Sequence, residues 1–407
     1  MTPFPLPLAQ IFGHWGAYLV FLVIGFLFGY VLEIAGFANS PKLAAQFYFK
    51  DLTVLKVMFS AIVVAMVLIF GASAMGLLDT NLIWVNPTYL WPGILGGLIM
   101  GAGFIVGGFC PGTSLVAAAT LKIDGLFFAL GAFFGIFLFG ETVGYYDEFW
   151  NSSYMGRFTI PDWLGLSTGL VALLVVLMAL FMFWGGEQLE RIFGGKDPAQ
   201  APKWRYAAAG ALMLGAVVLI ALGQPTTGDR WRRLAGEKEA LLAGRAVQIH
   251  PGELLDLLHA RQITVRMLDV RDEADYNLFH ILDAEHIPLA QIPAVVPALH
   301  LEPANTVVVV MSNDETAATE AWKILVAESV PNVYILEGGI NNWLDHFADN
   351  AFKATATTAD DRLRYTFNAA LGAHHLAAEP NPELFELTYT PKVQLELKRA
   401  PASGGCG

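Results

Sequence analysis

The sequence has few of the residues on which most enzyme chemistry depends. Only 15% of its 407 residues are charged, and only two are cysteines, Cys110 and Cys406. We find no glycine-rich nucleotide-binding loop and no cluster of metal-ligating side chains, and a net charge of -12 argues against a basic nucleic-acid face. We therefore expect no cofactor and no nucleic-acid partner.

Hydrophobic side chains are abundant instead, at 55% of the residues, which is too many for a soluble enzyme. Runs long enough to cross a hydrocarbon core of about 30 Å occur only before Gly223. We expect an α-helical membrane domain over residues 1–223 that crosses the bilayer several times, in membrane lipid. Its six predicted spans are Trp15–Gly36, Thr53–Gly76, Trp91–Gly108, Gly125–Tyr145, Leu164–Trp184 and Ala207–Leu222.

The loops differ in their content of lysine and arginine. The loops after the second and fourth predicted spans have only Arg157 between them, whereas the other loops are basic. Because positive charge is held on the cytoplasmic side, we predict that both termini lie outside, although three arginines in Asp229–Arg233 oppose this. We expect no cleaved signal peptide, a bacterial inner membrane location and a periplasmic soluble half.

The membrane half contains an internal repeat. A shift of 72 residues places Gly25–Lys50 on Gly97–Lys122 and matches Gly29 with Gly101 and Gly36 with Gly108. In each copy a glycine-lined span ends at a break, Asn39-Ser40-Pro41 in the first and Pro111-Gly112 in the second. Broken helices at matching places indicate a substrate site at the repeat interface, because freed amides and helix N-termini can face an anion there.

Cys110 lies at the second break, where the first has Ala38. The thiol could be only a small buried hydrophobe, and the glycines could serve only close helix packing. Amides freed at the break would instead place the thiol where an anion binds. Ionisable residues within spans also suggest function, and Glu33, Lys56 and Glu141 are of this kind. The candidate pathway residues are Cys110, Pro111, Gly112, Thr113, Gly108, Gly101, Gly36 and Glu33.

These stretches, residues 25–59 and 107–141, closely resemble the YeeE/YedE family of membrane proteins, whose characterised members take up thiosulfate and related sulfur compounds. The resemblance covers about the first 150 residues. It implies that thiosulfate passes pore cysteines through transient S–H to sulfur contacts, with Cys110 in such a position. Many relatives carry more than one such cysteine, whereas Ala38 occupies the equivalent place here. Because family members often have a larger membrane part, a homodimer could be needed to close the pathway.

The soluble half is predicted to be an α/β domain over residues 248–348, after a linker at 224–247. The β-branched runs Ile263–Val270, Asn305–Ser312 and Asn332–Leu336 predict strands. Helical periodicity at Glu315–Ser329 and a helix that begins near Gly338 complete an alternating pattern, which is typical of a small parallel sheet.

Two phrases, MLDVRDEADYNLFHILDAEHIPLAQI and VPNVYILEGGINNWLDHF, resemble the rhodanese domain of sulfurtransferases. The resemblance covers Ile249–Phe347 and implies a rhodanese-like fold. Its loop SNDETAA has Ser312 where the persulfide-forming cysteine would be, and Asp314 and Glu315 would repel thiosulfate. We therefore expect no catalysis at Ser312; the loop could dock a partner, or the domain could only space the tail.

Residues 349–407 are predicted to form a C-terminal extension that ends in a strand and a flexible arm carrying Cys406. The ending GGCG resembles the arm of the sulfur-carrier subunit in the bacterial thiosulfate-oxidising system, which implies that Cys406 carries sulfur covalently. The alternative is a terminus with an incidental cysteine.

Together these features predict a permease for thiosulfate or a related reduced-sulfur anion, with Cys406 as a carrier that meets a sulfur-transfer protein. A membrane-anchored sulfur carrier or sensor without transport is the competing interpretation. An active sulfurtransferase is a third.

Overall fold

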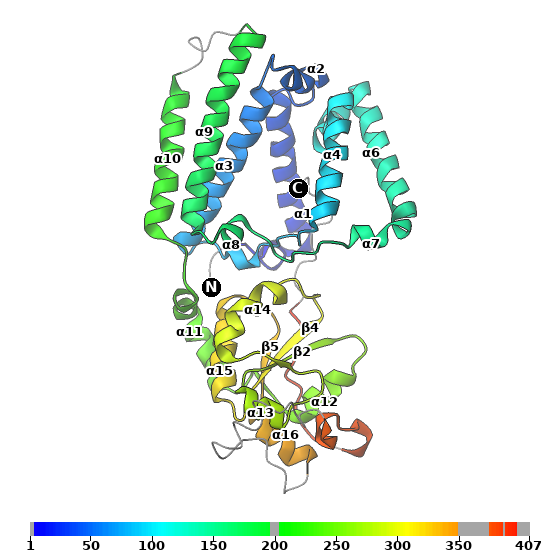
Figure 1. Cartoon of the computed structure of the whole chain (residues 1–407), viewed down its shortest axis with the longest axis vertical. Helices are drawn as coiled ribbons and strands as arrows, with labels where there is room; N and C mark the ends of the chain where they lie inside the picture. Colours follow the sequence, from blue (N-terminus) through cyan, green and yellow to red (C-terminus); the bar gives the residue numbers. More distant parts are fainter. Residues whose placement is uncertain (1–3, 196–202, 349–373, 386, 397–407) are drawn as a thin grey trace. The chain divides into compact units, whose positions relative to one another are not determined.

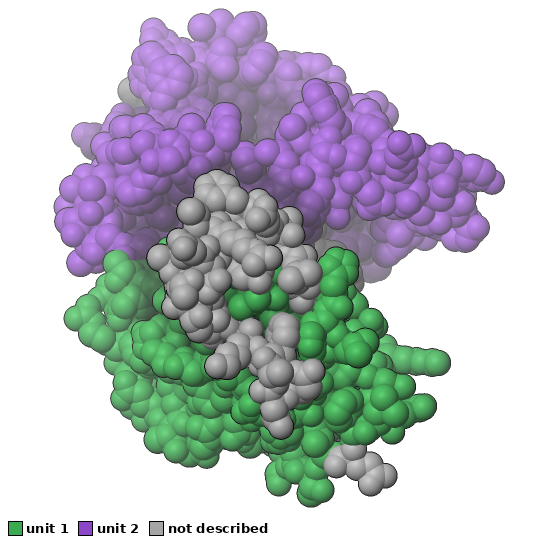
Figure 2. Space-filling view, turned by 60° about the horizontal axis from the view of Figure 1, so that its bottom comes forward, with its two compact units in different colours: residues 1, 225–402 green, residues 2–224, 403–407 purple. Residues whose placement is uncertain are grey.

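The computed structural model describes residues 4–195, 203–348, 374–385 and 387–396. They form two compact units that divide between Gln224 and Pro225 and are coloured separately in Figure 2. Cys406, predicted to carry sulfur, lies outside the described residues.

The membrane unit contains six helices that are long and apolar enough to cross a bilayer, which confirms the predicted number of spans. The helices run side by side in Figure 1. The fifth continues well past its predicted end at Trp184, so that Glu187 and Glu190 belong to it. The six are α1 (Leu8–Ile34), α3 (Thr53–Ala74), α4 (Leu90–Gly107), α6 (Ile123–Thr142), α9 (Thr168–Phe193) and α10 (Trp204–Leu222).

These helices pack in two groups within the unit. Helices α3, α9 and α10 contact one another around Val63, Val176, Ala179 and Ala216, all of which are buried. In the other group the short helix α5 (Pro111–Ala119) packs on α6 and α1, and the short helix α2 (Ser40–Ala44) packs on α4. The short helices begin within the two predicted breaks, at Ser40 and at Pro111.

Hydrogen bonds between loops fix which helix ends share a side of the membrane unit. The amide of Phe4 donates to the Leu77 carbonyl, and the amide of Thr88 donates to the Gly156 carbonyl. At the end of α10, the Gln224 side chain donates to the Phe70 carbonyl. The start of the described chain, the loop after α3, the loop after α6 and the exit to the soluble unit therefore lie on one side. The loop after α6 contains α7 (Asp147–Trp150) and α8 (Ile160–Leu164).

The soluble unit is built on a parallel five-stranded sheet with strand order β1-β5-β4-β2-β3, which confirms the predicted α/β fold. Strand β4 is wholly buried, as its run of valines predicts. The strands are β1 (Gln248–Ile249), β2 (Thr264–Asp269), β3 (Glu285–His286), β4 (Thr306–Met311) and β5 (Val333–Leu336).

Helices cover both faces of this sheet (Figure 1). One face packs against α12 (Pro251–His259) and α16 (Gly339–Phe347), and the other packs against α14 (Ile292–Leu299) and α15 (Thr316–Ala327). Helix α13 (Glu273–Leu278) follows β2.

Residues 224–247, predicted to be a linker, contain helix α11 (Thr227–Ala243), which packs on α15. Arg230 forms an ion pair with Glu328, and the ring of Trp231 meets that of Trp322 edge-on. The arginines that opposed an external location thus lie on a helix of the soluble unit rather than on a bare loop.

The described part of the C-terminal extension also packs on the soluble unit. Ala377 and Ala378 are buried in its core, and the Trp343 indole donates to the Ala377 carbonyl over 2.7 Å. Residues 387–396, where a strand was predicted, are extended but carry no strand ladder.

Candidate functional site

The two breaks of the membrane unit have the same backbone conformation. Gly36 and Gly108 have φ values of 82° and 70°, in the left-handed region that favours glycine. The residues that follow them, Phe37 and Phe109, are each only 1% exposed. The internal repeat predicted from the sequence therefore extends to the local geometry of both breaks.

The two breaks also lie against each other. A Cβ atom on Gly108 would lie 3.1 Å from Cβ of Ser40, the first residue of α2, so this approach requires a glycine. Phe37 and Ala38 of the first break share one buried cluster with Phe109 of the second. The repeat interface predicted to hold a substrate site is thus a packed junction.

Cys110 is the N-cap of α5 and is partly exposed. Its amide donates to Thr113 Oγ1 over 2.9 Å, and the Thr113 hydroxyl lies 3.1 Å from the Cys110 carbonyl oxygen and 3.3 Å from Sγ, either of which can accept its proton. The Gly112 amide has no hydrogen-bond partner among the described residues. An N-terminus of this kind carries partial positive charge that attracts anions.

Charged side chains connect the two repeats around this junction. Lys122, just before α6, forms an ion pair with Glu33 of α1 over 3.5 Å. Ser40 of the first repeat donates to Asp124 of the second over 2.7 Å. Together with Lys42 at the first break, the described part of the junction therefore contains two cations and two carboxylates.

The predicted pathway residues do not all meet. Cys110, Pro111, Gly112 and Thr113 form one turn, whereas Glu33 pairs with Lys122, whose amide donates to the Ala117 carbonyl in the last turn of α5. Gly36 instead faces Lys42, whose ammonium donates to the Ala35 carbonyl and so caps the C-terminus of α1. Gly101 lies about 10 Å along α4 from Gly108 and has open space beside its Cα atom.

Among the predicted intramembrane charges, Lys56 has a partner that sequence reasoning missed. Glu190, only 6% exposed, accepts from the Lys56 ammonium over 2.5 Å and from the Leu52 amide over 2.6 Å. A lysine inside a span requires a partner, and this could have directed attention to the carboxylates after Trp184. Glu141, the third predicted charge, is exposed near the end of α6.

In the soluble unit, Ser312 follows β4 and is only 3% exposed. Its hydroxyl donates to the Asp314 carbonyl over 2.7 Å and accepts from the Ala318 amide over 3.0 Å. The hydroxyl is therefore engaged within its own loop.

The carboxylates of the same loop occupy the start of α15. Asp314 accepts from the Thr316 amide over 2.7 Å and from the Thr316 hydroxyl over 3.0 Å. Glu315 accepts from the Gly338 amide over 2.7 Å and pairs with Arg245 over 2.6 Å. Donors that could hold an incoming anion are thus already bonded to carboxylates of this chain.

Side chains from the first rhodanese-like phrase lie beside this loop, and one of them bonds to it. Arg271 forms a fully buried ion pair with Asp269 and donates to the Asn313 side chain over 3.1 Å. His280 stacks on Tyr276 with ring centroids 3.9 Å apart, and burial lowers the pKa of His280. Arg271 therefore positions the loop through Asn313.

Comparisons with known proteins match the two units separately. Residues 35–233 match the sulphur transport family, and residues 250–346 match the rhodanese-like domain family. Over 209 residues the chain is 27% identical to the thiosulfate transporter TsuA of Spirochaeta thermophila, a match that covers 46% of this chain.

The chain spans 58% of the length of that relative. No solved structure matches the present chain. It is a multi-pass membrane protein that joins a domain of the sulphur transport family to a rhodanese-like domain.

Proposed function

We propose that the membrane unit transports thiosulfate or a related reduced-sulfur anion past Cys110. The observation that carries the proposal is the partly exposed thiol at the N-terminus of α5, at the junction of two broken helices. The similarity to a protein named as a thiosulfate transporter supports the same substrate class.

Each group at the junction has a role in this proposal. The amide end of α5 and the Lys122 ammonium attract the anion. The neutral thiol of Cys110 donates a weak S–H bond to a sulfur or oxygen atom of the passing substrate. Thr113 orients the thiol through its bonds to Cys110. Weak contacts of this kind allow the anion to leave again, which conduction requires.

The rhodanese-like domain has no sulfurtransferase activity at Ser312 in this proposal. A serine hydroxyl stays protonated at neutral pH and cannot form a persulfide, whereas a thiolate can. The carboxylates of Asp314 and Glu315 fill the positions where an anion would bind.

Cys406 supplies the reactive thiol instead. Its thiolate attacks the sulfane sulfur of thiosulfate and forms a new S–S bond. The S–S bond of thiosulfate breaks, and sulfite leaves with the electron pair. The persulfide on Cys406 is then handed to a sulfur-transfer protein by attack of that protein's thiolate on the outer sulfur.

The proposal places the protein in a bacterial inner membrane with the soluble unit in the periplasm. It also includes a homodimer, because every described spanning helix except α9 buries only 6–11% of its apolar stretch within one chain, against 33% for α9. A second copy would cover these helices and enclose the path beside Cys110. Cross-linked dimers in native membranes would support it.

Uptake of radiolabelled thiosulfate into proteoliposomes tests the transport function. We expect Cys110→Ala to abolish uptake and Cys406→Ala to leave the initial rate unchanged. The matched control is Ala38→Ser, which alters the equivalent position of the first break.

The reverse pattern, with uptake or sulfur trapping lost only in Cys406→Ala, would favour a membrane-anchored sulfur carrier or sensor. Formation of thiocyanate from thiosulfate and cyanide by Cys406→Ala protein would favour an active sulfurtransferase.

A further inference from the structure

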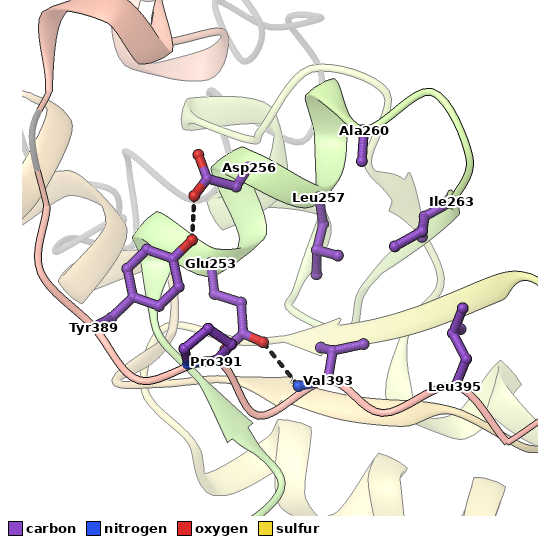
Figure 3. A pocket seen from close by; sticks show the side chains of 9 residues that line it. All are labelled: Glu253, Asp256, Leu257, Ala260, Ile263, Tyr389, Pro391, Val393 and Leu395. Carbon is purple, nitrogen blue, oxygen red and sulfur yellow. Dashed lines mark hydrogen bonds between the residues drawn. The ribbon is translucent and has the colours of Figure 1, made fainter.

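Residues 387–396, which we call the tail strap, lie extended along the rhodanese-like domain without joining its sheet. Figure 3 shows the strap beside α12, with the Glu253 side chain directed at its main chain. An extended segment held in this way resembles a bound peptide more than a structural strand, because its backbone groups are paired by side chains and not by a ladder.

The strongest of these contacts involves Glu253, in the first turn of α12. This side chain belongs to a residue that is only 4% exposed, and its Oε1 atom accepts from the amides of Lys392 and Val393, each over 2.8 Å. A buried carboxylate is costly unless it is hydrogen-bonded. The strap therefore satisfies Oε1 of this buried carboxylate, whereas Oε2 has no partner among the described residues.

Two further side chains, Asn332 and Tyr334, bind the strap main chain farther along. The Tyr334 hydroxyl accepts from the Gln394 amide over 2.9 Å and lies 3.1 Å from its carbonyl oxygen. Asn332 accepts from the Glu396 amide over 2.7 Å. Asn332 and Tyr334 are each 8% exposed and lie two residues apart in the sequence. The strap residues that they bind, Glu396 and Gln394, are also two residues apart. This matched spacing fixes the register of the strap.

The shape of the domain also fits the strap. A Cβ atom on Gly252 would lie 3.0 Å from the Tyr389 ring and 3.1 Å from Cβ of Leu387, so the strap lies closely on this glycine. The Lys392 ammonium donates to the Gln248 carbonyl over 2.6 Å, on the edge strand β1. The strap thus protects a sheet edge that could otherwise pair with another chain.

Apolar side chains of the strap and of α12 line the space between them. The strap forms one wall of a cavity of about 400 Å³, and α12 forms the other. Leu257 and Val393 face this space from the two sides (Figure 3). At one end of this cavity, the Tyr389 hydroxyl donates a hydrogen bond to Asp256.

We propose that the rhodanese-like domain is a receptor for residues 387–396 of its own chain and holds the base of the terminal arm. The receptor role requires no sulfur chemistry; only the use of the arm rests on the function proposed for Cys406.

The anchor lies at the end of the sheet opposite to Ser312. Glu396 is bound at Asn332, which directly precedes β5 and also donates to the carbonyl of Thr306 at the start of β4. Ser312 follows the other end of β4, about 20 Å away along the strand. Nine residues lie between Glu396 and Cys406, so ten Cα–Cα steps allow the thiol to reach at most about 36 Å from its anchor. The domain therefore limits where the arm can meet a partner.

Hydrogen exchange of the full chain tests the anchor. Lys392→Pro removes one amide that Glu253 accepts, and we expect the amides of Val393, Gln394 and Glu396 to exchange about tenfold faster or more. The matched control is Thr388→Pro, because Thr388 is exposed and its amide bonds to no described residue. We expect it to change these rates less than about twofold. Glu253→Ala, on the domain side, should act like Lys392→Pro.

Unprotected strap amides in the unaltered chain, or equal exchange in both proline variants, would overturn the proposal. Zero-length cross-linking then identifies the occupant, because the Lys392 ammonium lies 3.7 Å from the Glu337 carboxylate. In a mixture of isotopically light and heavy protein we expect links only within one chain, and mixed links would assign the groove to a second copy. Neither measurement involves thiosulfate, so a failure of uptake leaves both outcomes intact.

Discussion

The start of α5 in the membrane unit and the start of α15 in the soluble unit share one local plan and differ in what faces their amides. Cys110 is the N-cap of α5, whereas Ser312 lies four residues before the start of α15 and accepts a hydrogen bond from its Ala318 amide. At α5, among the described residues, the neutral Thr113 is the only side chain bonded to Cys110, and the Gly112 amide has no partner. At α15 the loop supplies two carboxylates: Asp314 accepts from the Thr316 amide, and Glu315 accepts from the amide of Gly338.

This difference shows that a helix N-terminus favours an anion but does not decide which anion it receives. Where the chain supplies aspartate and glutamate, the positive end is satisfied internally and the charge repels an incoming anion. Where it supplies cysteine and threonine, these two neutral residues cap each other and leave the Gly112 amide without a partner among the described residues. The three predictions below change one helix start at a time.

The largest effect is expected at a third helix start, that of α3. Here Glu190 accepts from the Leu52 amide and from Lys56. Glu190→Ala leaves a lysine without its carboxylate inside the membrane unit, and we expect a loss of about 3 kcal/mol in unfolding free energy. Thermal unfolding in detergent measures it.

The matched control is Glu187→Ala, which breaks the ion pair with Arg205 on a more exposed part of the same helix. In this variant we expect the free energy of unfolding to fall by about 1 kcal/mol or less. Equal losses would show that Glu190 is not a special cap of α3.

An intermediate effect is expected from Thr113→Val, which keeps the shape of the side chain but removes its bonds to Cys110. The thiol then loses its orientation, and we expect thiosulfate uptake to fall about tenfold. Initial rates in proteoliposomes measure it. Thr120→Val is the control, because that hydroxyl bonds only to carbonyls of its own helix; the same fall in both variants would contradict the proposed role of Thr113.

The smallest effect is expected from Ser312→Cys. A thiol at this position still faces Asp314 and Glu315, whose charges raise its pKa and repel thiosulfate. We expect no thiocyanate formation in a Cys406→Ala background. Activity should emerge only when Asp314→Ala is added, so full activity of the single substitution would show that the carboxylates do not block the loop.

Much of this protein could be predicted from its sequence. Six apolar runs specify six spans because backbone groups within a membrane must be satisfied inside each helix. The repeated Gly-Phe pairs at Gly36 and Gly108 specify both breaks, since a left-handed residue there favours glycine. Alternating strand and helix patterns specify the parallel sheet, and the local phrase around Ser312 specifies the acidic loop.

Contacts between distant segments were decided only by the tertiary structure. Glu190 meets Lys56 across 134 residues, and Glu253 meets the amide of Lys392 across 139. Neither pair has a local sequence signal, because the partner of a buried charge depends on which elements pack beside it. The sequence alone placed the thiol of Cys110 at a broken helix. Only packing joined that break to Ser40 and Lys122, because helix–helix contact is set by side-chain fit and charge between segments far apart in the chain.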